Sequence, residues 1–306
     1  MSDMLFQKRR RQIRRTTEDW VVDIVVYTIC AVVFLATFYP FYLSIVLAFN
    51  EGKDATYGGI YFWPRKPTLA NFAKLLDDPA WMHALLITVC RTVLGTFCTV
   101  FMTTFVSYGL SHRNLIGRKL YMTLFIVAMY LSGGVIPYYM VLRQLHLINN
   151  FLVYIIPGML SIFYVMVSIS FFQDIPQELA ESARLDGATE LQIFLRVILP
   201  LSLPLLATIA IFTAVGHWNS WYDTAFFTQN KQLRTMAYEL MAVINKSSLG
   251  QNSNLDAYAA SLASETVTNM SVQLAAMIVA VAPILCVYPF FQRYFVSGLT
   301  IGSVKG

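Results

Sequence analysis

The sequence predicts an all-α integral membrane protein with about six transmembrane helices. Of its 306 residues, 57% are hydrophobic and 13% are charged, whereas soluble domains carry about 25% charged residues. A helix needs about 20 predominantly apolar residues to cross a bilayer, and the chain holds several such runs. The four cysteines all lie inside apolar runs. This placement argues against a disulfide framework and against a metal cluster.

The predicted spans follow from the longest apolar runs. The first follows six basic residues, and no short apolar core with a small-residue cleavage site comes after them. We therefore interpret it as a retained span and not as a secretory signal. The six predicted spans are 21–48, 82–110, 119–145, 151–172, 199–222 and 271–295.

Lys and Arg near the span ends set the predicted orientation, because cytoplasmic loops carry an excess of these residues. The basic N-terminus, the stretch 111–119 and the end of the chain then share the cytoplasmic side. The predicted organisation is a basic cytoplasmic N-terminus (1–20), a transmembrane domain (21–295) and a cytoplasmic tail (296–306). Location in a membrane accounts for the net charge of +5 without a nucleic-acid partner.

Several predicted spans contain helix-breaking residues. The third holds "SGGVIPYYM" (132–140), the fourth holds Pro157-Gly158, and the last holds Pro283 and Pro289. Proline removes a backbone donor and kinks a helix. Two interpretations stay open: simple kinks, or helices that bend around a translocation path, where broken backbone is tolerated beside a cavity.

A few polar and aromatic residues of the spans are candidates for a solute pathway. Arg91 lies about ten residues into the second span, where a charge costs about 2.5–3.5 kcal/mol on insertion scales. It either pairs with a carbonyl or a partner helix, or faces a pathway for an acidic or hydroxyl-rich solute. The aromatic residues that end the fifth span suit either an interfacial belt or sugar stacking. The candidate pathway residues are Arg91, Tyr130, Tyr138, Trp218, Asn219 and Trp221.

Motifs that would supply catalysis or energy are missing from the sequence. It contains no G-x-x-x-x-G-K-[ST] loop, so the chain does not bind ATP by a P-loop, and neither H-E-x-x-H nor G-x-S-x-G occurs. Ion-coupled carriers usually need carboxylates at the membrane midplane, and here Asp23 lies only at the edge of the first span. We therefore expect no enzyme activity, no catalytic residues, no bound cofactor or metal, and energy from a partner. A self-contained secondary transporter or channel remains the alternative.

The stretch between the fourth and fifth spans is unusually polar. It predicts a short helix N-capped by Asp174, a turn at Gly187 and a second helix that starts at Thr189. Arg184 is placed to pair with Glu181 one turn earlier. The short helix has a stripe of small apolar residues, Leu179, Ala180 and Ala183. That stripe fits either docking in a cleft of another protein or packing within this chain.

The same stretch resembles the EAA loop of binding-protein-dependent ABC importer permeases. Glu181-Ser182-Ala183, Gly187 and the run from Val197 to Pro200 keep every spacing of the pattern E-A-A, G, I-x-L-P. Ser182 departs from the usual alanine and Val197 from isoleucine. The ending "QRYFVSGLTIGSVKG" is similar to the smaller permease of maltose-type systems. The stretches "DATYGGIYFWP", "SGGVIPYYM" and "WNSWYD" look like the branch that carries complex oligosaccharides, including pectin- and alginate-type fragments.

This resemblance implies a multi-pass permease of the bacterial inner membrane with a type I ABC importer fold and a cytoplasmic coupling helix. The implied partners are a second homologous permease, two ATPase subunits that hold ATP and Mg, an extracytoplasmic solute-binding protein, membrane lipid and an oligosaccharide. The implied coupling loop is 173–200. The resemblance assigns ATPase coupling to Glu178, Glu181, Ser182, Ala183, Arg184, Asp186, Gly187 and Pro200, and a tail contact with the ATPase to Gly302, Ser303, Val304 and Lys305.

Overall fold

The computed structural model describes residues 17–131, 133–253 and 266–302. Regular structure in these ranges is helical, as predicted, and a single isolated bridge joins Asn50 to Pro67. The basic cluster near the N-terminus lies outside the described residues. The elements are α1 (Thr17–Ala48), α2 (Gly52–Thr56), α3 (Ala70–Leu76), α4 (Pro79–Ser111), α5 (Arg118–Tyr130), α6 (Val135–Gln144), η1 (Phe151–Tyr154), α7 (Ile162–Gln173), α8 (Gln177–Leu185), α9 (Glu190–Ile193), η2 (Phe194–Ile198), α10 (Leu199–Leu201), α11 (Leu203–Asn219), α12 (Tyr222–Phe227), η3 (Lys231–Leu233), α13 (Met236–Ser253) and α15 (Asn269–Gly302).

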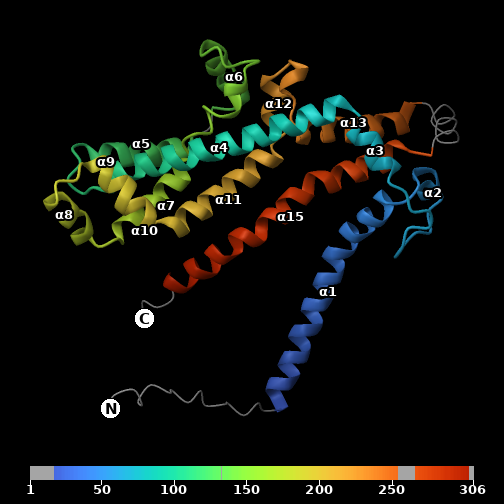
Figure 1. Ribbon diagram of the computed structural model, residues 1–306, viewed down its shortest axis with the longest axis horizontal. Coiled ribbons are helices and arrows are strands. Elements are labelled where there is room, and N and C mark those ends of the chain that lie inside the picture. Colours follow the sequence, from blue (N-terminus) through green and yellow to red (C-terminus); the bar gives the residue numbers. More distant parts are fainter. Residues whose placement is uncertain (1–16, 132, 254–265, 303–306) are drawn as a thin grey trace.

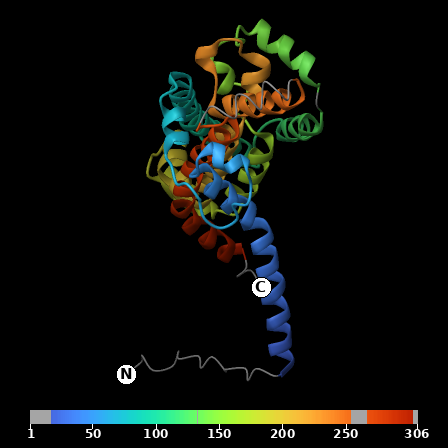
Figure 2. The same ribbon diagram turned by 90° about the vertical axis from the view of Figure 1, so that its right-hand side faces the viewer.

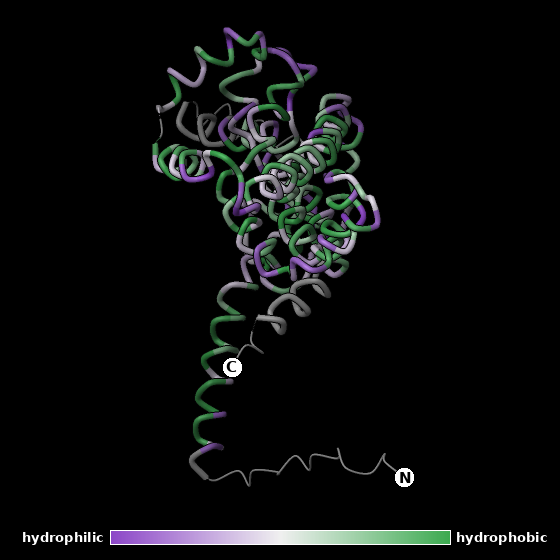
Figure 3. Tube along the Cα trace, turned by 90° about the vertical axis from the view of Figure 1, so that its left-hand side faces the viewer, coloured by the Kyte–Doolittle hydropathy of each residue, from purple (hydrophilic) through white to green (hydrophobic). Residues whose placement is uncertain are grey.

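The long helices form an elongated bundle. α4 packs against α11 and α7, while α15 packs against α11, α1 and α13. α8 and α9 lie at one end, called here the α8 end, and α2 and α3 lie at the opposite end, called the α3 end (Figure 1). α1 meets α15 at the α3 end and then diverges from the bundle (Figure 2). Hydrophobic residues follow almost the whole length of α1 (Figure 3), so its surface suits lipid or another apolar partner.

Three helices are long and apolar enough to cross a membrane, and they match the first, second and last predicted spans. They are Asp19–Ala48, Pro79–Ser111 and Asn269–Phe290. A fourth candidate is the pair Glu190–Leu201 and Leu203–Asn219, which meet at an angle of 81°. Among the described residues the structure therefore holds three or four such spans by length and composition, where the sequence predicted about six.

The third and fourth predicted spans are not continuous helices. α5 ends at Tyr130 and α6 begins at Val135, because Gly134 adopts φ 79° and ψ 179°, a conformation open to glycine. In the fourth, residues 155–161 are not α-helical around Pro157, and α7 begins only at Ile162. The sequence located both breaks correctly, but it placed each of them inside one continuous span.

The fifth predicted span begins with a sharp bend. A π-helical turn, Phe194–Ile198, precedes the bend at Ser202. Pro200 and Pro204 flank that residue and lack the backbone donors that would continue a straight helix. The Ser202 hydroxyl donates to the Ile198 carbonyl at 2.8 Å, which satisfies an acceptor at the bend.

Two buried clusters position the ends of the bundle. At the α8 end, aromatic and branched side chains from α4, α7, α9, η2 and α11 form one core. We call it the α8-end cluster: Tyr108, Phe172, Ile193, Phe194, Ile198, Leu205 and Ile209. At the α3 end, a smaller core joins α3, α4, α13 and α15 through Leu75, Trp81, Met236 and Ala276.

Candidate functional site

The helix–turn–helix at the α8 end is built by local signals. α8 ends at Leu185 with Asp186 at the C-cap, and Gly187 has φ 83°. The amide of Ala188 donates to the Ala183 carbonyl, and the amide of Gly187 donates to that of Arg184, both at 3.0 Å. These two bonds form a Schellman motif, which requires the left-handed residue that glycine supplies. The glycine turn predicted from the sequence is confirmed.

The caps on either side of this turn confirm one prediction and correct another. Thr189 accepts from the Gln192 amide, and the Gln192 side chain accepts from the Thr189 amide, so the predicted second helix starts with a capping box. Asp174 is the C-cap residue of α7 and not the N-cap residue of α8. α8 begins at Gln177 with Pro176 at the N-cap position.

The exposed face of α8 differs from the predicted docking stripe. Ala180 and Ala183 are half-buried against the α8-end cluster, so they serve this chain's own packing. Leu185 is instead 90% exposed. The exposed residues of α8 that do not line the pocket described below are Glu178, Leu179, Ser182 and Leu185.

A charged network ties α8 to the end of α4. Arg184 Nε donates to Glu190 Oε1 at 2.7 Å, and the Tyr108 hydroxyl donates to Glu190 Oε2 at 2.9 Å. His112 Nε2 lies 3.8 Å from the same oxygen. The hydrogen bond to Glu190 raises the pKa of Arg184. The predicted partner Glu181 is replaced by Glu190, because the turn at Gly187 brings the start of α9 beside Arg184.

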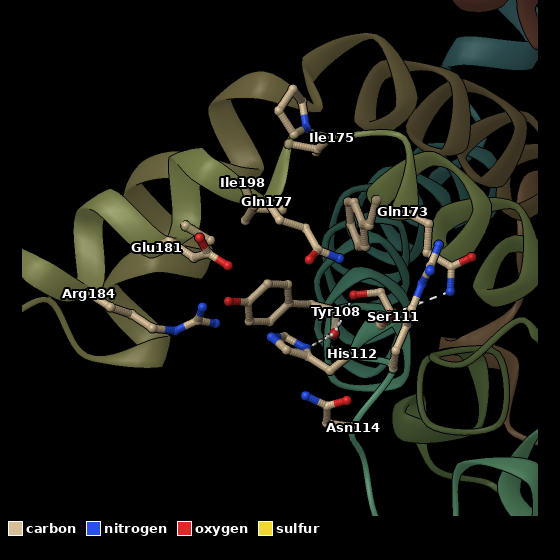
Figure 4. Close-up of a pocket in the computed structure, with 14 residues that line it drawn as sticks. Tyr108, Ser111, His112, Asn114, Gln173, Ile175, Gln177, Glu181, Arg184 and Ile198 are labelled. Carbon is tan, nitrogen blue, oxygen red and sulfur yellow. Dashed lines mark hydrogen bonds between the residues drawn. The ribbon is translucent and has the colours of Figure 1, made fainter.

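A polar pocket of about 410 Å³ separates α8 from the ends of α4 and α7. Figure 4 shows Glu181 and Arg184 reaching into it from α8, opposite Tyr108 and Ser111 from α4 and His112 at the C-cap of α4. The main packing neighbour of α8 is α9. α8 is therefore held mainly through the turn, the half-buried alanines and the charged network, with open space behind it.

Arg91 takes the first of its two predicted alternatives, pairing within the protein. Its side chain is 3% exposed. It donates to the Ser220 carbonyl at 3.0 Å and to the Asp223 carboxylate, and it stacks 4.6 Å over the Tyr154 ring. A guanidinium placed this way is not open to a solute, so the pathway assignment of Arg91 is not supported by this geometry. Both side-chain partners lie far away in sequence, and no local pattern marked them.

A hydroxyl cluster extends from this ion pair toward the α3 end. The Tyr154 hydroxyl donates to the Leu233 carbonyl at 2.6 Å and lies 3.0 Å from Thr224 Oγ1. Thr224 in turn lies 3.0 Å from Thr235 Oγ1. Through Tyr154, which stacks against Arg91, these contacts join η1 to α12 and η3. No local pattern marked this cluster, because Tyr154 lies about 70 residues before its partners in the sequence.

The aromatic candidates fall into two neighbouring hollows. Trp218, Asn219 and Trp221 line one of about 200 Å³ beside α13. The Trp218 indole donates to the Ala280 carbonyl at 2.8 Å, which fixes its ring. Tyr138 lines the second, of about 490 Å³, between α6 and Tyr222.

The other predicted site residues, Tyr130, Pro200 and Gly302, do not line either hollow. Tyr130 is exposed at the last residue of α5. Pro200 lies in α10 beside the bend that leads into α11. Gly302 is the last residue of α15, and the other tail residues, Ser303, Val304 and Lys305, lie outside the described residues. The predicted tail contact therefore stays a prediction.

The fold and the site together define a multi-span helical membrane protein with an exposed helix–turn–helix at one end, which is the build of a transport subunit. Residues 92–301 match the family of binding-protein-dependent transport system inner membrane components. The chain belongs to this family, and the resemblance to ABC importer permeases is confirmed.

Two of the named relatives match over almost their whole length, and a third matches over about 71% of it. The chain is 33% identical to Protein LplC of Bacillus subtilis over 286 residues, covering 92% of this chain and 95% of the relative. It is also 33% identical to the polygalacturonan/rhamnogalacturonan transport system permease protein YtcP of Bacillus subtilis, covering 93% and 98%. Arabinooligosaccharide permease AraQ of the same organism is 30% identical, covering 70% and 71%.

Solved structures give the same fold. A chain of a bacterial ABC transporter involved in the import of the acidic polysaccharide alginate superposes with a TM-score of 0.83 at 25% identity, covering 92% of this chain and 99% of that one. A chain of the alginate transporter in complex with an alginate pentasaccharide-bound periplasmic protein gives a TM-score of 0.56 at 14% identity, which shows the fold alone.

Proposed function

We propose that this chain is the permease subunit of an ATP-driven importer of oligosaccharides, with acidic oligosaccharides as the first class to test. It would form half of the translocation pathway. Family membership supports the transport role. The pectin-type permease and the alginate importer among the similar proteins support the acidic sugar class.

The observation that carries the coupling role is the way α8 is presented. α8 stands exposed at one end of the bundle, turns sharply at Gly187 and connects to α4 through Arg184 and Glu190. We propose that its outward face docks on an ATP-binding subunit, which makes the α8 end cytoplasmic. A push on α8 would pass through the turn at Gly187 into α9, its main packing neighbour.

The partners follow from this role. The chain has no P-loop, so ATP and Mg would be held by two partner ATPase subunits. A second permease would complete the pathway, and an extracytoplasmic binding protein would deliver the sugar. Within this chain, Trp221 and Asn219 are the proposed sugar contacts, because an aromatic face beside an amide suits the C–H face and hydroxyls of a sugar ring.

Docking through α8 is tested by a charge on its exposed tip. Leu185→Glu should leave the fold unchanged, since the side chain is 90% exposed, and should reduce co-purification of the ATPase subunit. The matched control is Ile116→Glu, which is 92% exposed in the loop between α4 and α5. Equal recovery of the ATPase with both variants would show that α8 is not the docking helix.

The transported class is tested with the assembled complex in proteoliposomes. Its binding protein is supplied on the outside together with one member of a panel of acidic and neutral oligosaccharides. ATP hydrolysis should rise with the acidic oligosaccharides. Stimulation by neutral ones alone would overturn the acidic class. Uptake by the purified chain under an ion gradient, without ATPase subunits, would establish the secondary-transporter alternative instead.

A further inference from the structure

Residues 57–63, called here the aromatic loop, expose four large aromatic side chains at the α3 end. Tyr57 is 75% exposed, Tyr61 60%, Phe62 73% and Trp63 77%. The aliphatic residue between them, Ile60, is 7% exposed and therefore turns inward. So large a group of exposed apolar rings marks a surface that contacts another phase or another molecule.

The aromatic loop is held in place at its base. The Glu51 amide donates to the Lys66 carbonyl at 2.9 Å, and the Lys66 amide donates to Asn50 Oδ1 at 2.7 Å. Arg65 pairs with Asp54 at 3.1 Å and donates to the Gly58 carbonyl at 2.8 Å. The rings are therefore presented by a closed structure, with its charged residues gathered at the base.

The tip of the aromatic loop lies back along α1. The Tyr42 hydroxyl donates to the Phe62 carbonyl at 2.5 Å, and the Tyr39 and Phe62 rings are 6.4 Å apart. At 1.5 Å per residue, Tyr42 lies about 9 Å before the end of α1 at Ala48. Figure 1 shows the chain after α2 returning beside this end of α1.

The depth of this contact in a bilayer follows from the length of α1. Its uninterrupted apolar stretch starts after Asp23, and about 20 residues cross the hydrocarbon core, which places the far edge near residue 43. Tyr42 and the Phe62 carbonyl thus fall at that edge. Tyr and Trp are enriched at this level, because their rings suit the acyl boundary and their polar groups suit the headgroups.

We infer that the aromatic loop is a membrane anchor, whose rings enter the headgroup–acyl boundary of the leaflet at the α3 end, beside α1. Its ligand is the phospholipid surface. The loop would reach this depth whichever way the chain faces. An anchor here would steady the end of α1, the helix that diverges most from the bundle (Figure 2).

The test measures the depth of a fluorophore in the assembled transporter in lipid nanodiscs. Trp63→Cys is made after replacing the four native cysteines and is labelled with an environment-sensitive dye. Asp77→Cys, exposed in the turn between α3 and α4, is the matched control. Phosphatidylcholine brominated on its acyl chains reports lipid contact, and iodide in the buffer reports water contact.

The Trp63 label should lose fluorescence to brominated lipid and be shielded from iodide, whereas the Asp77 label should show the reverse. Strong iodide quenching at both positions would overturn the anchor, because the loop would then lie in water. Shielding from both quenchers would also overturn it and would assign the surface to the second permease. If Trp63→Cys does not assemble, Tyr61→Cys on the same loop gives the same measurement.

Discussion

Replacing Gly187 by valine tests whether the angle of α8 matters for transport. Gly187 has φ 83°, a region that costs a residue with a Cβ about 1–2 kcal/mol and a β-branched residue more. A Cβ at this position would meet no atom within 4 Å, so the cost comes from the backbone alone. A penalty of about 1–2 kcal/mol lowers the population of the correctly angled helix about 5–30-fold.

The assay compares sugar uptake and sugar-stimulated ATP hydrolysis in proteoliposomes that contain the assembled transporter. We expect Gly187→Val to reduce both by a factor within that range, and Gly187→Asn to reduce them less, because asparagine tolerates the left-handed region. Gly109→Ala, near the C-terminal end of α4, is the neutral control, since its Cβ also meets nothing within 4 Å. Uptake by the valine variant at the wild-type level would refute the reasoning.

The remaining predictions concern the α3 end. Asp223→Ala leaves the buried guanidinium of Arg91 without its carboxylate and should destabilise the protein by about 3–5 kcal/mol, measured as a lower Tm. An added Arg91→Met change should restore part of the lost stability. An unchanged Tm in the single variant would contradict the pairing. The pKa of Asp54 is lowered, mainly by the hydrogen bond from Asn50. Its stabilisation of the aromatic loop is therefore complete above the ordinary value of 3.8 and is lost as pH falls through the lower folded pKa. Iodide access to the labelled loop should rise over that acidic window in the wild type, and Asp54→Asn should abolish the pH dependence. Tyr42→Phe should raise iodide access at neutral pH, and no change would mean that the hydroxyl does not fix the loop.

Local signals predicted the helix–turn–helix at the α8 end, because its determinants are neighbours in sequence. Gly187 supplies a backbone conformation by itself, and Thr189 and Gln192 satisfy each other three residues apart. The partner of Arg184 was mispredicted for the same reason. Glu181 is one helical turn away, but the structure brings Glu190 closer once the chain has turned. A pattern within one helix cannot show what a turn places opposite it.

The α3 end was less predictable, because its contacts join distant segments. Arg91 was recognised as a residue that needs a partner, but Asp223 lies 132 positions later. The third predicted span, 119–145, was wrong as one continuous helix. Its helix-breaking residues were recognised, but the sequence did not show that α5 and α6 are separate helices on either side of Gly134. The sequence therefore identified Arg91 and the helix-breaking glycines, but not the partner of Arg91 or the separation of α5 from α6.

The two charged networks differ in a way that bears on the proposed mechanism. The side chains of Arg184 and Glu190 are 41% and 57% exposed, and exposed pairs contribute about 0–1 kcal/mol. The side chain of Arg91 is 3% exposed, and separating a buried pair costs about 3–5 kcal/mol. A transporter that changes shape on ATP binding will rearrange first where the contacts are weakest. We therefore expect α8 to shift against α4 at the polar pocket. The Arg91–Asp223 pair should meanwhile hold α4 and α12 in a fixed relative position. Cross-links that fix α8 to α4 should then stop transport, and cross-links between α4 and α12 should not.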